Sequence, residues 1–243
     1  MLARLHEDLA EYWALAGPLY SADPVLHTVE LHVGARLRRT ASDPAVALIT
    51  LTDLGHLAGA AMVTGQGLVR NAIPMAGVTA TVSLLAKAAI RLPAVSGAPV
   101  VTRAVADTWV SMTGAAISDT TDERLYRLDH FQPRRLLPTG GCLPALGTRR
   151  RARCHGRSAG TDRRGIADRS GVHRGPAHRG RGYGSAVTAA ACEWARQAGA
   201  QEIVLTTDLA NPTSNSIYRK LGFRAVVDSV IVEFAAPTAL RAP

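Results

Sequence analysis

The order of apolar and polar positions predicts a layered α/β chain. Leu2, Leu5, Leu9 and Trp13 are spaced three or four apart, as on one face of a helix, and Gly17-Pro18 is expected to end that helix. The predicted elements up to position 131 are helices over 2–16 and 24–37, strands over 45–51 and 57–64, a helix over 77–91, a strand over 95–101, a helix over 103–113 and a strand over 124–128.

The periodicity disappears between Gln132 and Arg181 and then returns abruptly. A helix is predicted over 184–198, with Val187, Ala191 and Trp194 on its apolar face, followed by strands over 202–207 and 224–234. Between these strands a helix begins at Asn211-Pro212 and ends at Gly222, which suits a left-handed C′ position. The predicted fold is therefore α/β, a mixed sheet flanked by helices, with regions at 1–131, 132–177 and 178–243.

Composition supports a globular chain and adds little chemistry. Hydrophobic residues make up 47% of the 243 positions, enough for a sizeable core. The longest apolar stretch is interrupted by Lys87, and acidic residues lie within the first apolar pattern, so neither a membrane span nor a secretory signal is expected and we expect a cytoplasmic protein. Cys142, Cys154 and Cys192 lack the spacing of a zinc site or a disulfide framework, and no metal is implied.

The net charge of +9 comes from one segment. Residues 134–182 contain 13 arginines and two aspartates, a local charge of +11 that leaves the rest of the chain close to neutral. An arginine-rich arm that binds nucleic acid is one interpretation. The segment has no aromatic residue between Phe131 and Tyr183 that would stack on bases, which argues against it. A basic loop is another interpretation.

A glycine-rich turn precedes the helix predicted over 184–198. It consists of Arg179, Gly180, Arg181, Gly182, Tyr183, Gly184 and Ser185. Glycines let the backbone approach an anion closely, and the first N–H groups of a helix favour a phosphate. The spacing is G-x-G-x-G, so it does not fit the dinucleotide-binding fingerprint of a Rossmann fold.

A second motif follows one helix and one strand later, over Asn211–Phe223. Together the two motifs resemble the GNAT superfamily of N-acetyltransferases: the first matches R/Q-x-x-G-x-G/A, and the second matches N-x-x-x-N-x-x-x-Y-x-x-x-G-F. The resemblance covers residues 178–234. The first half of the chain resembles, more weakly, the divergent GNAT-like half of two-part actinobacterial members, through its layer order and the strand at Glu123–Leu128.

The resemblance implies acetyl-CoA as cosubstrate and, as acceptor, a primary amine of a small molecule or a peptide. Amides from Arg179 to Ser185 would hold the coenzyme pyrophosphate, and Asn211 and Asn215 would bond the pantetheine arm or neighbouring backbone. Tyr218 would be the general acid for the departing thiolate, since a phenol has a pKa above that of a thiol. Asn211 as a simple N-cap and Tyr218 as a packed aromatic are the structural alternatives.

No general base is visible. The sequence has no glutamate between Glu123 and Glu193, and His173 and His178 lie in the basic segment, where solvated histidines are expected. Where the family has an apolar strand before the phosphate turn, this chain has arginine-rich residues. We expect residues 147–174 to be translated out of frame, because a shifted reading of plausible codons yields strand-like RIGPVYT for 167–174.

Three functions follow from these patterns. The first is an acetyl-CoA-dependent N-acetyltransferase, impaired to whatever extent the anomalous segment disturbs it. The second is a noncatalytic acyl-CoA-binding or regulatory protein, and the third is a basic nucleic-acid binder. The acceptor amine and the oligomeric state are left open by the sequence.

Overall fold

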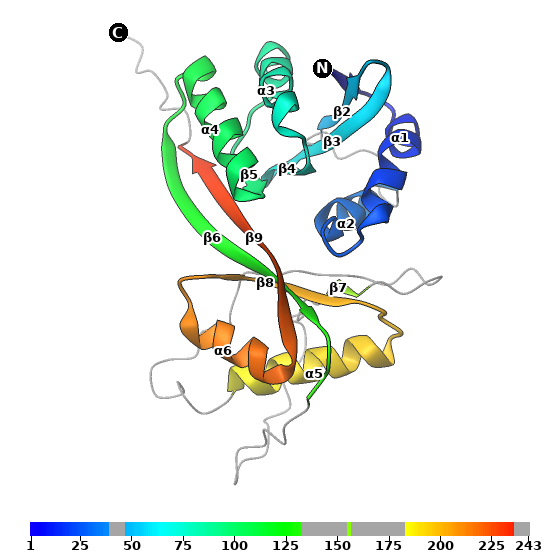
Figure 1. Cartoon of the computed structure of the whole chain (residues 1–243), viewed down its shortest axis with the longest axis vertical. Coiled ribbons are helices and arrows are strands. Elements are labelled where there is room, and N and C mark those ends of the chain that lie inside the picture. Colours follow the sequence, from blue (N-terminus) through cyan, green and yellow to red (C-terminus); the bar gives the residue numbers. More distant parts are fainter. Residues whose placement is uncertain (39–46, 133–154, 157–182, 236–243) are drawn as a thin grey trace. The chain divides into compact units, whose positions relative to one another are not determined.

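The computed structural model describes residues 1–38, 47–132, 155–156 and 183–235. They fall into two compact units (Figure 1). Unit 1 contains Met1–Glu123 with the chain from Asp228 onward, and unit 2 contains Arg124–Val227. Strands β6 (Ile117–Leu128) and β9 (Phe223–Phe234) each run from one unit into the other. The division into 1–131, 132–177 and 178–243 stays a prediction.

Unit 1 is a mixed sheet with helices on both faces. Its strands are ordered β1-β2-β3-β4-β5-β9, antiparallel except for the parallel pair β4 and β5. The remaining elements of this unit are β1 (Leu2–His6), α1 (Leu9–Ala22), α2 (Thr28–Leu37), β2 (Ala47–Asp53), β3 (His56–Thr64), β4 (Gly67–Ala72), the 3-10 helix η1 (Met75–Gly77), α3 (Val78–Lys87), β5 (Ala94–Gly97) and α4 (Pro99–Thr113).

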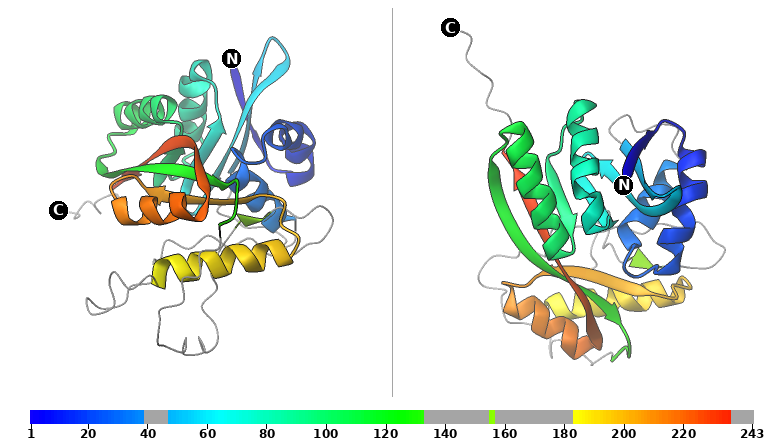
Figure 2. Two further views of the ribbon diagram at one scale, coloured as in Figure 1. Left: turned by 60° about the horizontal axis from the view of Figure 1, so that its bottom comes forward. Right: turned by 45° about the horizontal axis from the view of Figure 1, so that its top comes forward.

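Alternation along the strands divides the interior of unit 1 into two cores. Ile49 of β2 packs with α3 and α4, whereas its neighbour Leu48 packs with α1 and α2. Ala61 and Met62 of β3 are divided in the same way, because successive side chains of a strand point to opposite faces. Figure 2 shows α3 and α4 side by side along the sheet.

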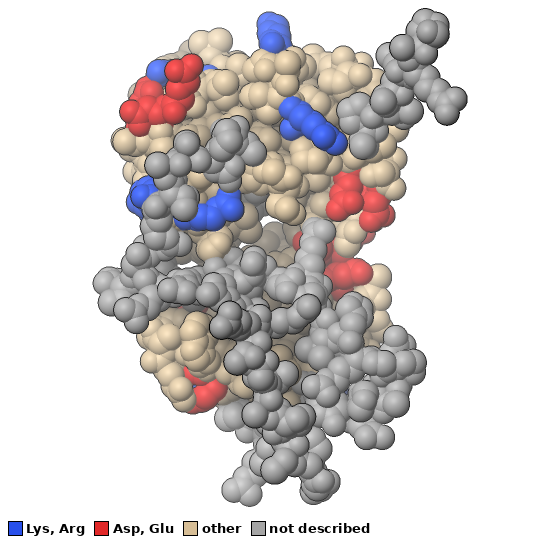
Figure 3. All heavy atoms as spheres, turned by 180° about the vertical axis from the view of Figure 1, so that it is seen from behind, with Lys and Arg blue, Asp and Glu red and all other residues tan. Residues whose placement is uncertain are grey.

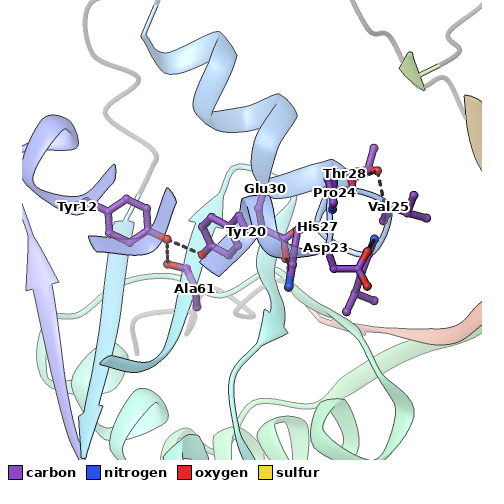
Figure 4. A network of polar contacts seen from close by, with 10 residues as sticks. Tyr12, Tyr20, Asp23, Pro24, Val25, His27, Thr28, Glu30 and Ala61 are labelled. Atoms are coloured by element: carbon purple, nitrogen blue, oxygen red, sulfur yellow. Dashed lines mark hydrogen bonds and ion pairs between the residues drawn. The ribbon is translucent and has the colours of Figure 1, made fainter. Parts of the chain in front are cut away.

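The core under α1 and α2 contains polar side chains (Figure 4). The hydroxyls of Tyr12 and Tyr20 lie 2.6 Å apart, and Tyr12 donates to the Ala61 carbonyl at 3.1 Å. Glu30 is fully buried, and its Oε1 lies 3.5 Å from Nδ1 of buried His27. Burial raises the pKa of both tyrosines above the ordinary value of a phenol.

Unit 2 is smaller and holds the two motifs. Its strand order is β9-β6-β8-β7, and Tyr126, Cys192, Ala195, Ile203, Leu221 and Phe223 form its buried core. The elements not yet given are β7 (His155–Gly156), α5 (Tyr183–Gln197), β8 (Ile203–Asp208) and α6 (Pro212–Leu221). A mixed sheet flanked by helices was predicted, and that fold class is confirmed.

The start of the chain differs from the prediction. Residues 2–6 form strand β1, which pairs antiparallel with β2, and α1 begins only at Leu9. Asp8 makes this boundary, because its carboxylate accepts from the Ala10 and Glu11 amides at 2.6 and 3.3 Å. The predicted break at Gly17-Pro18 is also wrong: α1 continues through it.

Three smaller differences concern the strands. Strand β4 lies between the strand expected over 57–64 and the helix expected over 77–91, where the predicted order of elements includes an optional strand without bounds. The strand expected over 95–101 stops at Gly97, because Pro99 starts α4 as its first residue. The strand expected over 124–128 begins at Ile117, in an exposed polar stretch whose alternation is weak.

The described surface carries few charges on the face that Figure 3 shows, where basic and acidic side chains are scattered. All 13 arginines of residues 134–182 lie outside the described residues, as does the segment expected to be out of frame apart from His155–Gly156. No helix within the described ranges is long and apolar enough to cross a membrane.

Candidate functional site

The predicted phosphate turn is only partly described. Arg179, Gly180, Arg181 and Gly182 lie outside the described residues, as do the candidate bases His173 and His178. Tyr183, Gly184 and Ser185 form the first turn of α5. The N–H groups of a first turn have no partner within their helix, and the helix dipole makes that end positive, so these three residues provide backbone donors suited to an anion.

The start of α5 lies against α6. A Cβ atom placed on Gly184 would sit 3.4 Å from Cδ1 of Ile217, an ordinary van der Waals contact. The structure therefore brings Gly184, at the end of the predicted phosphate turn, beside the helix that carries Tyr218. A methyl group at 184 would fit in ordinary contact with α6.

The apolar face predicted for α5 is partly wrong. Cys192 and Ala195 are the buried residues of this helix, whereas the side chain of Trp194 is 55% exposed. Small residues let α5 pack closely on β8 and α6, and an indole on that face would hold them apart. Because the buried positions of α5 carry only small residues, the apolar pattern in the sequence does not show which face of the helix is buried.

Helix α6 begins and ends as predicted. The Asn211 Oδ1 accepts from the Ser214 amide at 3.1 Å, Pro212 is the first helical residue, and Gly222 ends the helix with a φ of 98°. Asn211 therefore caps the helix. Its expected bond to the pantetheine arm stays a prediction.

Asn215 is buried, and its side-chain amide is engaged on both sides. Its Nδ2 donates to the carbonyls of Asp208 at 2.9 Å and Asn211 at 2.7 Å, and its Oδ1 accepts from the Tyr126 hydroxyl at 2.9 Å. Of the two partners expected for Asn215, neighbouring backbone is the one its donors contact here. Tyr126 is a partner that the sequence did not reveal, because it lies on β6, 89 positions away.

Tyr218 is half-buried at the edge of the unit 2 core. Its ring centroid lies 6.2 Å from that of Tyr126 and 6.0 Å from that of Phe223, both within the range of aromatic pairs. These contacts agree with the alternative in which Tyr218 is a packed aromatic residue, and they also hold its ring in place. Its role as general acid stays a prediction.

A surface hollow of about 360 Å³ lies elsewhere in unit 2. Its lining residues are Leu128, Asp129, His130, Phe131, Arg196, Ala200, Gln201 and Ile203. Arg196 and Ala200 lie at or just beyond the C-terminal end of α5, and a helix of this length spans roughly 20 Å, so the hollow is remote from Gly184. Within the described ranges, no cluster of His, Cys, Asp or Glu could hold a metal ion.

Comparison with known proteins points to the same segment as the two motifs. The model of the Acetyltransferase (GNAT) family matches residues 164–223, about a quarter of the chain, and the described residues of this match lie within unit 2. The resemblance of this part to the GNAT superfamily is confirmed. The match begins upstream of His178, inside the arginine-rich segment.

The other comparisons add less. No curated protein matches the chain. Among solved structures, a match is an acetyltransferase from the GNAT family from Colwellia psychrerythraea, with 11% sequence identity, coverage of 97% of this chain and 100% of that chain, and a TM-score of 0.48. A likeness of that degree carries no argument about what this chain does.

Proposed function

We propose that this protein is an acetyl-CoA-dependent N-acetyltransferase that acetylates a primary amine and that its coenzyme site lies in unit 2. The observation that carries the proposal is the approach of Gly184 to Ile217, which places the first turn of α5 beside the helix of Tyr218. The family match over residues 164–223 covers both elements.

In this proposal, different residues of unit 2 bind the coenzyme and donate the proton. Backbone N–H groups of Tyr183, Gly184 and Ser185, together with those of Arg179–Gly182, hold the pyrophosphate at the positive end of α5. Acetyl-CoA supplies the thioester. The amine nitrogen bonds to the acetyl carbon as the carbon–sulfur bond breaks. The Tyr218 phenol gives its proton to the sulfur and is reprotonated from solvent, while the proton of the attacking nitrogen passes to solvent. The described residues identify no base for that last transfer.

Calorimetric titration with acetyl-CoA tests the coenzyme site. We expect binding in the micromolar range. A Gly184→Glu variant adds a carboxylate where the pyrophosphate would lie, yet an acidic side chain at a helix N-terminus favours folding. We expect at least about tenfold weaker binding from like-charge repulsion at close range. The matched control is Ala190→Glu, which adds the same charge at an exposed position farther along α5.

A second candidate function is noncatalytic binding of acyl-CoA. It is favoured by the side chains of Asn211 and Asn215, whose described hydrogen bonds serve the backbone and Tyr126. Release of free coenzyme A thiol, followed with a panel of primary amines, separates the two functions. Turnover on an amine supports the transferase, whereas tight binding without release of thiol above the protein-free rate supports the binding protein.

A further inference from the structure

Tyr126 is a buried phenol whose hydroxyl makes a long-range hydrogen bond within the described part of unit 2. It lies on β6 with 2% of its surface exposed, and it donates to Oδ1 of Asn215, on α6. A buried hydroxyl on a strand normally finds a nearby backbone carbonyl. This one bonds a side chain that itself connects to two other segments.

The Asn215 side chain links Tyr126 to two further residues, which makes a three-way link. Its Nδ2 bonds the last residue of β8, Asp208, and the cap of α6, Asn211. The turn between these residues is tightened further, because Asp208 Oδ1 accepts from the Ala210 amide at 2.7 Å. The Asn215 amide thus acts together with the Asn211 cap in fixing where α6 begins, and Tyr126 orients that amide by bonding its oxygen.

The same phenol also contacts the candidate acid. Residues 215 and 218 lie three positions apart on α6 and so share a face of the helix. The Tyr126 ring therefore lies beside both, bonded to Asn215 and 6.2 Å from the ring of Tyr218. A change in the start of α6 would move Tyr218 with it.

We propose that Tyr126 is a positioning residue for Tyr218: through the Asn215 side chain it fixes the turn from β8 into α6 and so the place of the Tyr218 phenol. This inference rests on the proposed transferase function. Tyr126 itself is not required to touch the substrate. Its effect is on geometry, and a displacement of about 1 Å in a catalytic group can lower a rate by about a hundredfold.

The variant Tyr126→Phe removes the hydroxyl and keeps the ring. We expect kcat on an accepted amine to fall at least about tenfold, while the Kd for acetyl-CoA changes by less than about threefold, because the interaction lost acts on the reacting step. In a cycle with Asn215→Ala, the double variant should be about as slow as Asn215→Ala alone, since residues acting as one unit are not additive. The control Ala195→Gly removes a buried methyl group and helix propensity from α5, away from this link.

Hydrogen exchange gives a readout independent of activity. In Tyr126→Phe the Ser214 and Asn215 amides, at the start of α6, should exchange about tenfold faster once the link is lost, whereas in Ala195→Gly they should not. The resonance of fluorotyrosine at position 218 should shift only in the former. Unchanged exchange and an unchanged resonance would overturn the positioning role. Faster exchange and a shifted resonance in a chain that binds no acetyl-CoA would uphold it and overturn the transferase instead.

Discussion

Nδ1 of His27 lies 3.5 Å from Oε1 of Glu30 in the core beneath α1 and α2, and neither carboxylate oxygen has a hydrogen-bond partner among the described residues. Both side chains are drawn in Figure 4. Glu30 is fully buried and His27 is 6% exposed. A buried carboxylate is costly unless a partner compensates it. Among the described residues the His27 imidazole is the partner that the Glu30 carboxylate contacts, so removing either side chain alone should lower the stability of unit 1.

We expect His27→Phe to destabilise unit 1 by about 3–5 kcal/mol, because the carboxylate is left without its partner. Phenylalanine keeps the ring contact that His27 makes with Tyr20, whose centroid is 5.2 Å away. Adding Glu30→Met should recover most of the loss, since an apolar pair of similar volume is often neutral or stabilising. Urea unfolding of the three proteins measures this. A cost under about 1 kcal/mol for the single variant would show that the carboxyl does not need the imidazole.

The buried phenols of Tyr12 and Tyr20 predict a loss of stability at high pH. Their pKa values are raised mainly by burial, so above about pH 10 the unfolded chain loses phenolic protons that the folded chain keeps. The unfolded state then binds fewer protons, and the free energy of unfolding falls with rising pH by up to about 1.4 kcal/mol per unit for each phenol. Tyr20→Phe should give a shallower decline in urea titrations from about pH 9 to 11. Parallel curves for the two proteins would contradict this.

Gly222 is expected to tolerate no side chain. Its φ of 98° is in the left-handed region, and a Cβ atom would collide with the carbonyl oxygen of His130. The Gly222 carbonyl also accepts from the Asp129 amide at 3.1 Å, which fixes this approach. Gly222→Ala should therefore destabilise unit 2 by more than the roughly 1–2 kcal/mol of left-handed strain alone.

Gly199→Ala is the matched control for that prediction. Gly199 ends α5 with a φ of 81°, and a Cβ atom there meets nothing within 4 Å. It carries the strain without the collision. Denaturant unfolding of both variants should show the larger loss for Gly222→Ala, and equal losses would mean that the chain from His130 moves aside at little cost.

Local signals explain which parts of the fold the sequence predicts well. Asn211-Pro212 and Gly222 act through caps and backbone angles that depend on a few neighbouring residues, so α6 was predicted almost to the residue. Residues 2–6 were misassigned because Leu2, Leu5 and Leu9 fit a helical spacing as well as β1 followed by a cap. Pairing with β2, across more than 40 positions, decides between them, and periodicity does not contain that information.

The candidate site shows the same limit. The two motifs identified the first turn of α5, Asn211, Asn215 and Tyr218, because glycine, cap and aromatic positions recur at fixed spacing. Nothing in the sequence joins Tyr126 to Asn215, since a hydrogen bond between residues 89 positions apart follows from the sheet order. Strand alternation places Tyr126 on a face of β6, and its partner is seen only in the folded chain.

The role of Tyr218 gives the sharpest test of the proposed chemistry. Tyr218→Phe keeps the ring beside Tyr126 and Phe223 and removes only the hydroxyl that carries the acidic proton. A general acid typically contributes about 10²–10⁴-fold, so kcat should fall within that range, with acetyl-CoA affinity nearly unchanged. Release of coenzyme A thiol and calorimetry measure the two quantities, and Tyr20→Phe, a phenol deletion in unit 1, controls for stability. If affinity and rate fell together, the phenol would be holding the coenzyme; if neither changed, the thiolate would leave without a protein acid, and the ring of Tyr218 would serve packing alone.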